Sequence, residues 1–276
     1  MTRRVLHVSD LHFGRDRPEL QRPLIETINR LAPDLVAVSG DFTQRARLGQ
    51  FRAARAFLSR LEPPWLAVPG NHDTPLDNLA VRLFRPWDRY RRYIHESLEP
   101  SWTDGEIAVA GANTANPFSW QRGRLGSGAV RRLCRAFGEP DPARTQIAVL
   151  HHPLEHGPDV EKRLMRGART ALRRMGECGV DIVLSGHLHN WQARPFADAG
   201  GVLFVQAGTS LSTRHRGEPN DFNLLTIEGA RVRVEQWTAS HDEPDFAPAR
   251  KVDFEKTAGT WTMHSGPAEA AAAPVE

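Results

Sequence analysis

Short apolar runs alternate with amphipathic stretches along most of the chain. Six runs are bounded by turn residues and are continuous rather than alternating, which is typical of strands buried on both faces. They cover residues 4–9, 35–39, 66–69, 147–150, 182–185 and 202–206. Strands of this kind, separated by helices, indicate βαβ units and an α/β fold.

The stretches between these runs predict helices and one hairpin. Apolar residues recur at helical spacing over 54–61, 130–137 and 160–175. Residues 222–227 and 232–237 flank a turn and predict two antiparallel strands. We therefore expect two mixed sheets packed face to face with helices outside, in one domain over 1–264. The tail 265–276 has no periodicity that could bury a face, and we expect it to be disordered.

Composition narrows the class of protein without indicating its chemistry. The 276 residues are 40% hydrophobic and 25% charged, which describes a globular protein whose core needs no disulfide. Cys134 and Cys178 fall at apolar positions of predicted helices, so we expect reduced, buried thiols. No stretch resembles a signal peptide or a membrane span, which predicts a cytoplasmic protein. The net charge of +3 is modest.

Polar side chains with metal-binding chemistry follow five of the six apolar runs. They are Asp10 and His12, Asp41, Asn71, His151, and His187 with His189. Each alone would be interpreted as a turn or helix cap. Together they stand at corresponding points of one predicted sheet, beyond the carboxyl ends of the strands, where α/β proteins bind ligands. Glycines beside three of the clusters permit close backbone approach.

The number of these side chains indicates the kind of site. Seven ligands are too many for one tetrahedral zinc and too few for two separate closed sites, unless one carboxylate is shared. Oxygen and imidazole donors without thiolate suit zinc, manganese, iron or cobalt. Two metals about 3.5–4 Å apart are the usual arrangement in phosphatases and nucleases. The residues therefore predict a dinuclear centre that hydrolyses phosphate esters.

The motifs resemble those of the calcineurin-like metallophosphoesterases: D-x-H, GD, GNH[DE], H and GHxH, in that order. The match runs from Asp10 to His189. The resemblance implies a four-layer α/β/β/α sandwich with two metal ions at the strand ends and a metal-bound hydroxide as the nucleophile. It assigns Asp10, His12, Asp41 and His189 to one ion, and Asp41, Asn71, His151 and His187 to the other, with Asp41 as the bridge.

The resemblance also assigns a role to the histidine that follows Asn71. His72 is not a ligand there; it contacts the phosphate and protonates the leaving oxygen, with Asp73 as a candidate for orienting its ring. His151 is preferred as the ligand over His152 because it lies directly at the strand end. We expect His152 to pack or to contact a ligand.

The short sequence segments around the ligands resemble one branch of this family most. SDLHFG, SGDFTQ, PGNHD, LHHPL, SGHLHN and AGTS are similar to class III cyclic nucleotide phosphodiesterases and glycerophosphodiesterases. The resemblance implies a small phosphodiester substrate. The chain departs from the family where Pro153-Leu154 replaces a double proline beside the substrate.

Three arginine-containing segments allow two interpretations each. Residues 82–95 interleave arginines with aromatic residues, either as an arm that grips a nucleotide, a lipid headgroup or a second subunit, or as a helix that packs its aromatic side on the domain. The spacing of Phe84, Trp87 and Tyr90 favours the packed helix. Two further sets either reach the site or lie in exposed loops. They are Arg122 with Arg124, and Arg214 with His215 and Arg216.

Other functions are compatible with parts of this pattern. An exonuclease would carry a DNA-binding appendage and a basic stripe, so we expect no stable nucleic-acid complex. Peripheral membrane contact through residues 82–95 would suit a hydrolase of lipid-linked UDP-sugars or phospholipids. A binding module that has lost catalysis has no need of His72. The sequence leaves open a homodimer.

Overall fold

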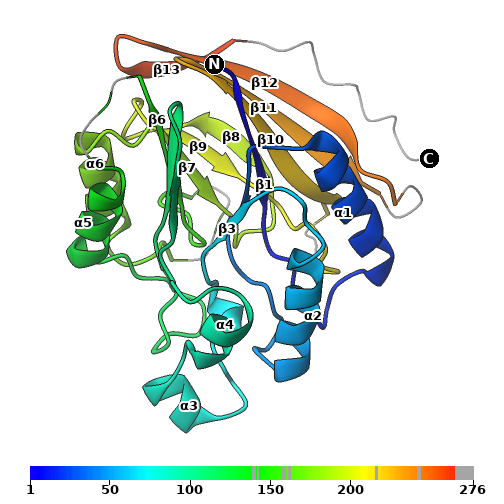
Figure 1. Cartoon of the computed structure of the whole chain (residues 1–276). Coiled ribbons are helices and arrows are strands. Elements are labelled where there is room, and N and C mark those ends of the chain that lie inside the picture. The colour runs from blue at the N-terminus through cyan, green and yellow to red at the C-terminus, as the bar shows by residue number, and fades with distance from the viewer. Residues whose placement is uncertain are drawn as a thin grey trace.

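Two mixed β-sheets pack face to face, with helices on both outer faces (Figure 1). The computed structural model describes residues 1–138, 141, 143–156, 160, 163–214, 217–240 and 244–264. The tail 265–276 and the pair His215 and Arg216, for which predictions were made above, lie outside the described residues.

The first sheet has seven strands, in the order β13-β12-β11-β10-β1-β2-β3. The strands β1, β2 and β3 run parallel, and β10 pairs with β1 in antiparallel fashion, with Val5 opposite Leu225. Their bounds are β1 (Arg3–Val8), β2 (Leu35–Val38), β3 (Trp65–Ala67), β10 (Asn220–Glu228), β11 (Arg231–Ala239), β12 (Ala247–Thr257) and β13 (Thr260–His264). The carboxyl ends of the three parallel strands therefore meet at one edge.

The second sheet has six strands, in the order β4-β5-β6-β7-β9-β8. Four of them, β5, β6, β7 and β9, are parallel, and the edge strands β4 and β8 run the other way. Their bounds are β4 (Ser101–Thr103), β5 (Ile107–Gly111), β6 (Thr145–Val149), β7 (Ile182–Ser185), β8 (Gln192–Pro195) and β9 (Leu203–Gln206).

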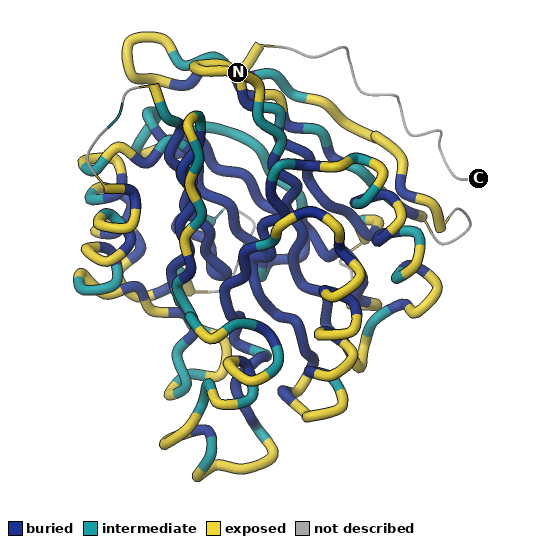
Figure 2. The backbone as a smooth tube through the Cα atoms, viewed as in Figure 1, coloured by how far each residue is buried: buried dark blue, intermediate teal, exposed yellow. Residues whose placement is uncertain are grey.

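Three apolar layers separate the sheets and helices, because successive side chains of a strand point to opposite faces. Leu6 packs in the layer beneath α1 (Pro18–Leu31) and α2 (Leu48–Leu58), whereas Val5 lies in the layer between the two sheets. The helices α5 (Ser127–Ala136) and α6 (Ala168–Glu177) cover the second sheet. Figure 2 shows the central strands buried and the outward turns of the helices exposed. The predicted four-layer α/β/β/α sandwich is confirmed.

All six predicted runs form strands, and the predicted hairpin is β10 and β11. Sequence reasoning missed β5 because Ala108, Ala110 and Gly111 weaken its apolar run, although all its residues are buried. It also missed β12, whose residues are mostly exposed or half-buried and carry no continuous apolar run.

Two predicted helices differ from the observed ones. The helix predicted over 160–175 begins only at Ala168, because Gly167 is left-handed (φ 86°) and Arg166 forms strand-like hydrogen bonds with Gly123 and Leu125. The segment 82–95 does not form one helix. It divides into α3 (Leu79–Phe84) and α4 (Asp88–Tyr93), separated at Pro86, which cannot continue a helix from the preceding turn.

The prediction of reduced thiols is wrong. Cys134 in α5 and Cys178 at the end of α6 form a disulfide, with Cα atoms 5.9 Å apart. Cys134 lies on a helix, as expected, whereas Cys178 directly follows one, and both are half-buried. The sequence could not show that α5 and α6 pack side by side on the same sheet. Within the described residues, no helix combines the length and apolar character needed to cross a bilayer.

Candidate metal centre

The seven predicted ligands come together at the carboxyl ends of five strands. Those after β1, β2 and β3 approach from the first sheet, and those after β6 and β7 approach from the second. Six of the seven are buried and His187 is half-buried. The site therefore lies where the ends of the two sheets meet.

One group of ligand atoms forms around Asp10. Its Oδ1 atom lies 3.0 Å from Nε2 of His189 and 3.4 Å from Nε2 of His12. The two histidine Nε2 atoms are 3.3 Å apart. Three such atoms, all within 4.8 Å of one another, are spaced as ligands of a single ion would be.

A second group forms around His151. Its Nε2 atom lies 3.2 Å from Oδ1 of Asn71 and 3.3 Å from Oδ2 of Asp41. The ring of His187 contacts that of His151, with centroids 5.2 Å apart. The same Asp41 oxygen is 3.6 Å from Nε2 of His12. Asp41 therefore lies between the two groups.

Backbone carbonyls orient two of the histidine rings. Nδ1 of His151 lies 2.7 Å from the Ser39 oxygen, and Nδ1 of His189 lies 2.6 Å from the Arg214 oxygen. A carbonyl only accepts hydrogen bonds, so Nδ1–H donates and Nε2 is directed at the carboxylates. Metal-binding histidines are commonly held in this way, and the donor set therefore fits a metal ion.

The electrostatics of the buried carboxylates favour a cation. Burial alone would raise the pKa of Asp41, but His151 and the other nearby histidines keep that pKa below its usual range. Burial would likewise lower the pKa of His151, yet Asp41 and Asp10 raise it to about 9. The two carboxylates thus draw positive charge into the site, which a bound metal ion would also supply.

Five of the seven residues have a left-handed backbone. The φ angles are 54° at Asp10, 48° at His12, 52° at Asp41, 71° at His187 and 61° at His189. Such a conformation is uncommon outside glycine and costs roughly 1–3 kcal/mol per residue in strained sites. Strain of this kind gathers at functional sites, where the surrounding structure enforces it.

Glycine is required where the two sheets touch. A Cβ atom at Gly186 would overlap Oγ of Ser9 and Oδ2 of Asp10. The absence of a side chain lets the next residue, His187, donate its backbone N–H to Asp10 Oδ2 at 2.9 Å. This hydrogen bond links the loop after β7 to the loop after β1.

His72 lies at the edge of the centre, but Asp73 does not orient it. The Nδ1 atom of His72 is 2.8 Å from the backbone oxygen of Gln44, so that carbonyl fixes the ring. The Asp73 carboxylate instead accepts backbone N–H groups of Phe42, Thr43 and Gly70. Asp73 therefore holds the loop that carries Asp41, and the expected Asp73–His72 contact is corrected.

Arg214 reaches the centre, which was one of the two interpretations of its segment. Its Nη1 atom lies 3.2 Å from Nε2 of His72 and 3.4 Å from Oε1 of Gln44. Arg122 points elsewhere and donates to the Leu164 oxygen at 2.8 Å. Gln44 was missed at this site, because nothing in the sequence distinguishes it from an ordinary loop glutamine.

His152 adjoins the centre with both ring nitrogens engaged by the chain. Nε2 donates to the Gln121 oxygen at 3.0 Å, and Nδ1 lies 2.8 Å from Oγ1 of Thr114. Burial lowers the pKa of this imidazole to about 3. A neutral ring with two partners packs and positions neighbours, although its centroid is only 4.5 Å from that of His187.

The loop after β9 forms hydrogen bonds with the backbone of Ser9 and Asp10. Thr209 donates its hydroxyl to the Asp10 backbone oxygen at 2.7 Å, and Ser210 accepts the Ser9 N–H at 3.2 Å. The buried Asp221 holds this loop through the Gly208 N–H and also accepts from Gln236. The AGTS sequence therefore supports the backbone of Ser9 and Asp10.

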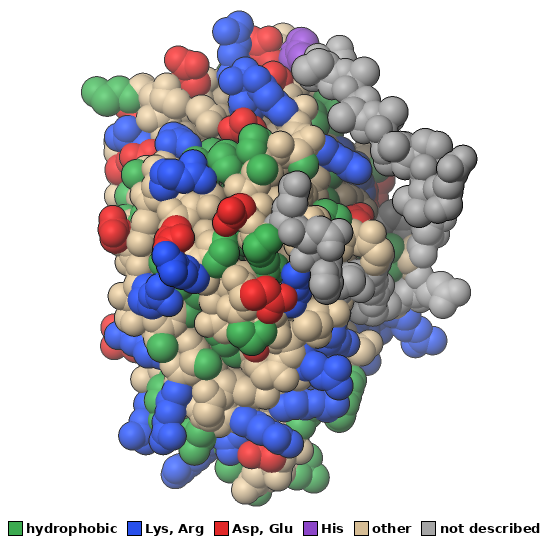
Figure 3. Space-filling model, turned by 90° about the vertical axis from the view of Figure 1, so that its right-hand side faces the viewer, with side chains coloured by type: hydrophobic (Ala, Val, Ile, Leu, Met, Phe, Trp, Pro, Cys, Tyr) green, Lys and Arg blue, Asp and Glu red, His purple; other side chains and the backbone are tan. Residues whose placement is uncertain are grey.

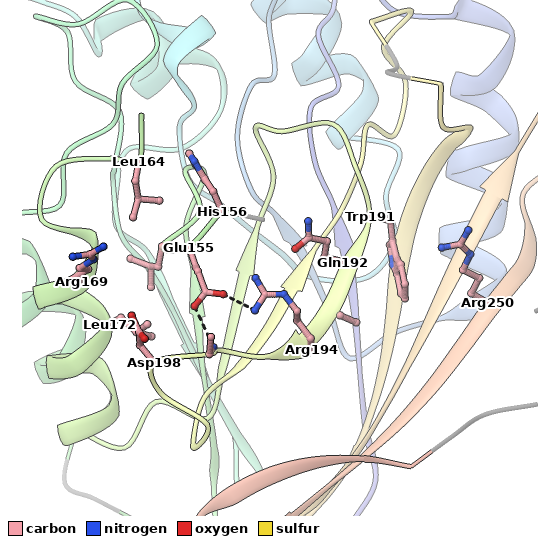
Figure 4. A pocket seen from close by; sticks show the side chains of 13 residues that line it. Glu155, His156, Leu164, Arg169, Leu172, Trp191, Gln192, Arg194, Asp198 and Arg250 are labelled. Atoms are coloured by element: carbon pink, nitrogen blue, oxygen red, sulfur yellow. Dashed lines mark hydrogen bonds and ion pairs between the residues drawn. The ribbon is translucent and has the colours of Figure 1, made fainter. Parts of the chain in front are cut away.

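A separate hollow of about 840 Å³ lies beside β8 and α6 (Figure 4). Glu155 and Arg194 form an ion pair within it, and Trp191 lies on its other side with Arg250 over the indole ring. None of the seven strand-end side chains lines it. The hollow and the metal centre are therefore distinct places.

Several relatives share part or most of this chain. A glycerophosphodiester phosphodiesterase, GpdQ of Enterobacter lignolyticus, is 35% identical over 78 residues, which are 24% of this chain and 28% of that protein. The UDP-2,3-diacylglucosamine pyrophosphatase LpxG of Chlamydia muridarum is 32% identical over 73 residues, 25% of this chain and 22% of its own. A probable cyclic nucleotide phosphodiesterase of Synechococcus is 22% identical over 219 residues, 68% and 74% of the two chains.

The fold is similar to that of a purple acid phosphatase, PPD1 of yellow lupin. The TM-score is 0.63 at 15% identity, covering 90% of this chain and 53% of the lupin one. The family model of the calcineurin-like phosphoesterases matches residues 3–191, a range that begins at β1 and passes all seven strand-end side chains. The chain therefore belongs to the calcineurin-like phosphoesterase family.

Proposed function

We propose that the seven strand-end side chains hold two metal ions and that the protein hydrolyses phosphodiesters. One ion would be held by Asp10, His12, Asp41 and His189, and the other by Asp41, Asn71, His151 and His187. The observation that carries this assignment is the position of Asp41, whose Oδ2 atom lies 3.3 Å from His151 and 3.6 Å from His12. Oxygen and imidazole donors suit manganese, iron, zinc or cobalt.

The residues around the ions would divide the remaining chemistry. When bound, two such ions neutralise phosphoryl charge and make hydroxide available near neutral pH. Because the Gln44 carbonyl holds Nδ1–H of His72, Nε2 is the atom that would first take up a proton and then deliver it to the leaving oxygen. Arg214, 3.2 Å from that nitrogen, is placed to bind a phosphoryl oxygen beside it.

We propose a small phosphodiester, of the cyclic nucleotide or glycerophosphodiester type, as the substrate. A diester has one ionised oxygen and a poor alkoxide leaving group, which needs the proton that His72 would supply. A monoester carries a second negative charge. It would offset more of the positive charge of the two metal ions, and that charge is what makes hydroxide available for attack. The similarity to GpdQ and to the Synechococcus protein supports the diester.

Turnover of paired substrates tests this proposal. The manganese-loaded protein should show a higher kcat/KM for bis-p-nitrophenyl phosphate than for p-nitrophenyl phosphate, and for cyclic AMP than for AMP. Elemental analysis of the same sample should give two metal ions per chain. A preference for the monoester in both pairs contradicts the substrate class, whereas a single ion with full activity contradicts the dinuclear assignment.

A second candidate is the hydrolysis of a lipid-linked diester or pyrophosphate at a membrane surface. The similarity to LpxG over 73 residues favours it. Including a UDP-linked lipid and a phospholipid in the substrate panel separates the candidates, because an enzyme for small diesters would turn over neither faster than cyclic AMP.

We propose a cytoplasmic location. Disulfides such as the one between Cys134 and Cys178 are rare in the cytosol and common in oxidising compartments, so the location needs a direct test. Cell fractionation should recover the protein together with a cytosolic marker enzyme. Recovery with an extracytoplasmic marker would overturn this location.

A further inference from the structure

Exposed apolar side chains gather at one end of the molecule. The structure exposes eight large hydrophobic side chains among the residues it describes, and five of them belong to α3 and the loop after β5. These five, with their exposed fractions, are Phe84 (83%), Phe118 (78%), Leu79 (68%), Trp120 (62%) and Leu83 (38%). We call the two segments that contain them, 77–93 and 113–124, the distal lobe; α3 and α4 form the lower end of the molecule in Figure 1.

Arg82 joins the two segments of the distal lobe. Its buried guanidinium donates to Oγ1 of Thr74 at 2.7 Å and to the backbone oxygen of Ser119 at 2.9 Å. Ser119 lies between Phe118 and Trp120, so this contact holds their loop against α3. The exposed apolar side chains of the two segments therefore belong to one surface that Arg82 holds together.

The distal lobe is also strongly basic. Its two segments contain seven arginines and two aspartates, with no lysine or glutamate, whereas the whole chain has a net charge of only +3. Asp77 is already paired with Arg89. Figure 3 shows Lys or Arg and hydrophobic side chains side by side at the same lower end of the molecule.

We propose that the distal lobe docks on an anionic membrane surface. Aromatic and aliphatic side chains enter the headgroup boundary, and arginines bind the acidic headgroups around them. Charge complementarity selects this occupant over a second copy of the chain, because a symmetric contact would set two basic lobes against each other. The proposal does not depend on which ester the metal centre hydrolyses.

Docking would bring the metal centre to the bilayer. Thr74, which Arg82 contacts, follows the loop of Asn71 and His72, and the Gln121 carbonyl of the lobe accepts from His152. The lobe is therefore directly connected to two of the loops that carry the strand-end side chains. A lipid-anchored substrate would be presented beside them, whereas a soluble one gains nothing from docking.

Vesicle co-sedimentation of the full chain tests the proposal. The protein should bind phosphatidylcholine vesicles that contain about 30 mol% phosphatidylglycerol, and should bind pure phosphatidylcholine weakly, because the headgroup charge supplies part of the attraction. Raising the salt concentration should weaken binding to the anionic vesicles. Absence of binding to the anionic vesicles at low salt would overturn the proposal, whatever the outcome of the turnover assays.

Matched variants locate the surface. Phe84→Ser should lower the vesicle partition coefficient by about tenfold, and Phe84→Ser with Trp120→Ser by more, since each removes an anchoring side chain. Met263→Ser, which removes a side chain that is 59% exposed on β13, should change nothing. Equal losses in Phe84→Ser and Met263→Ser contradict docking through the lobe.

Two further experiments test the role of the arginines and the alternative that a second copy of the chain covers the lobe. Arg85→Gln with Arg91→Gln should weaken binding to anionic vesicles, whereas Arg131→Gln with Arg135→Gln on α5 should not. Sedimentation velocity of the free protein should show a monomer. A dimer that Phe84→Ser dissociates would assign the surface to a second copy of the chain and overturn the membrane proposal.

Discussion

The metal centre and the distal lobe depart from the usual distribution of residues in opposite ways. At the centre, carboxylates and imidazoles are buried, and Asp10, His12 and His151 expose no surface at all. In the lobe, Phe84 and Trp120 are mostly exposed. Buried charge needs a partner and exposed apolar surface needs an occupant. Both departures therefore point to binding, one of cations and the other of a surface.

Substitution of Asp41, the residue between the two ligand groups, should reduce activity most. Asp41→Asn should abolish measurable turnover of bis-p-nitrophenyl phosphate and reduce the bound metal to one ion or none, because the bridge between the ions is lost. The matched control is Asp34→Asn at the other end of β2, where Asp34 accepts the Arg4 N–H. Retention of both ions by Asp41→Asn would contradict the bridging assignment.

His72→Ala should retain both metals and lose about 10²- to 10⁴-fold in rate on a diester with an alkoxide leaving group, as removal of a positioned proton donor does. The loss should be smaller for p-nitrophenyl esters, whose leaving group needs little protonation. His95→Ala, remote from the centre, serves as the control. Equal losses on both kinds of ester would show that His72 acts only by binding phosphate.

Asp221 supports the centre without touching a ligand, and its effect should appear as a pH dependence of stability. Burial raises the pKa of Asp221 to about 7. The folded state therefore holds this proton more tightly than the unfolded chain, so stability should fall as the pH rises from about 4 to about 7. The change amounts to roughly 4 kcal/mol, since one pKa unit corresponds to about 1.4 kcal/mol.

Asp221→Asn should remove that component of the pH dependence while its side chain still accepts the Gly208 N–H. Urea unfolding of metal-free protein between pH 4 and pH 8 measures the difference from the unaltered chain. Parallel stability curves for the two proteins would show that Asp221 ionises normally.

The smallest effect is expected in the lobe. Arg82→Gln removes hydrogen bonds to Thr74 and Ser119 and should cost about 1–3 kcal/mol in local stability. Limited proteolysis should then cleave within 113–124 sooner, while metal content stays unchanged. Arg52→Gln, exposed on α2, is the control. Loss of the metals from Arg82→Gln would show that lobe and centre are one structural unit.

The position of the strand-end side chains could be predicted from local sequence patterns. A continuous apolar run followed by Asp, Asn or His identifies a buried strand and its carboxyl end, and parallel strands bring such ends together. Asp10, Asp41, Asn71, His151 and His187 could therefore be expected to meet. The strand order could not be predicted from these runs, because pairing depends on contacts between residues far apart.

The partners of the polar groups and of the cysteines could not be predicted in this way. His72 is held by Gln44 and approached by Arg214, 142 residues later in the chain, and not by the neighbouring Asp73. Cys134 and Cys178 pair because two helices share one sheet. A local pattern of apolar and polar residues indicates whether a side chain is buried or exposed. Its contact partner is often distant in the sequence, so a short stretch of sequence cannot identify it.

The distal lobe shows the same limit for apolar residues. Helical spacing predicted that Phe84, Trp87 and Tyr90 would pack on the domain, and Tyr90 is indeed buried, with its hydroxyl donating to the Ala67 oxygen. Pro86 ends α3 before that face can continue, so Phe84 turns outward while Arg82 turns inward. These side chains are apolar, and burial would be favourable for each of them. The packing of α3 nevertheless leaves Phe84 exposed to solvent.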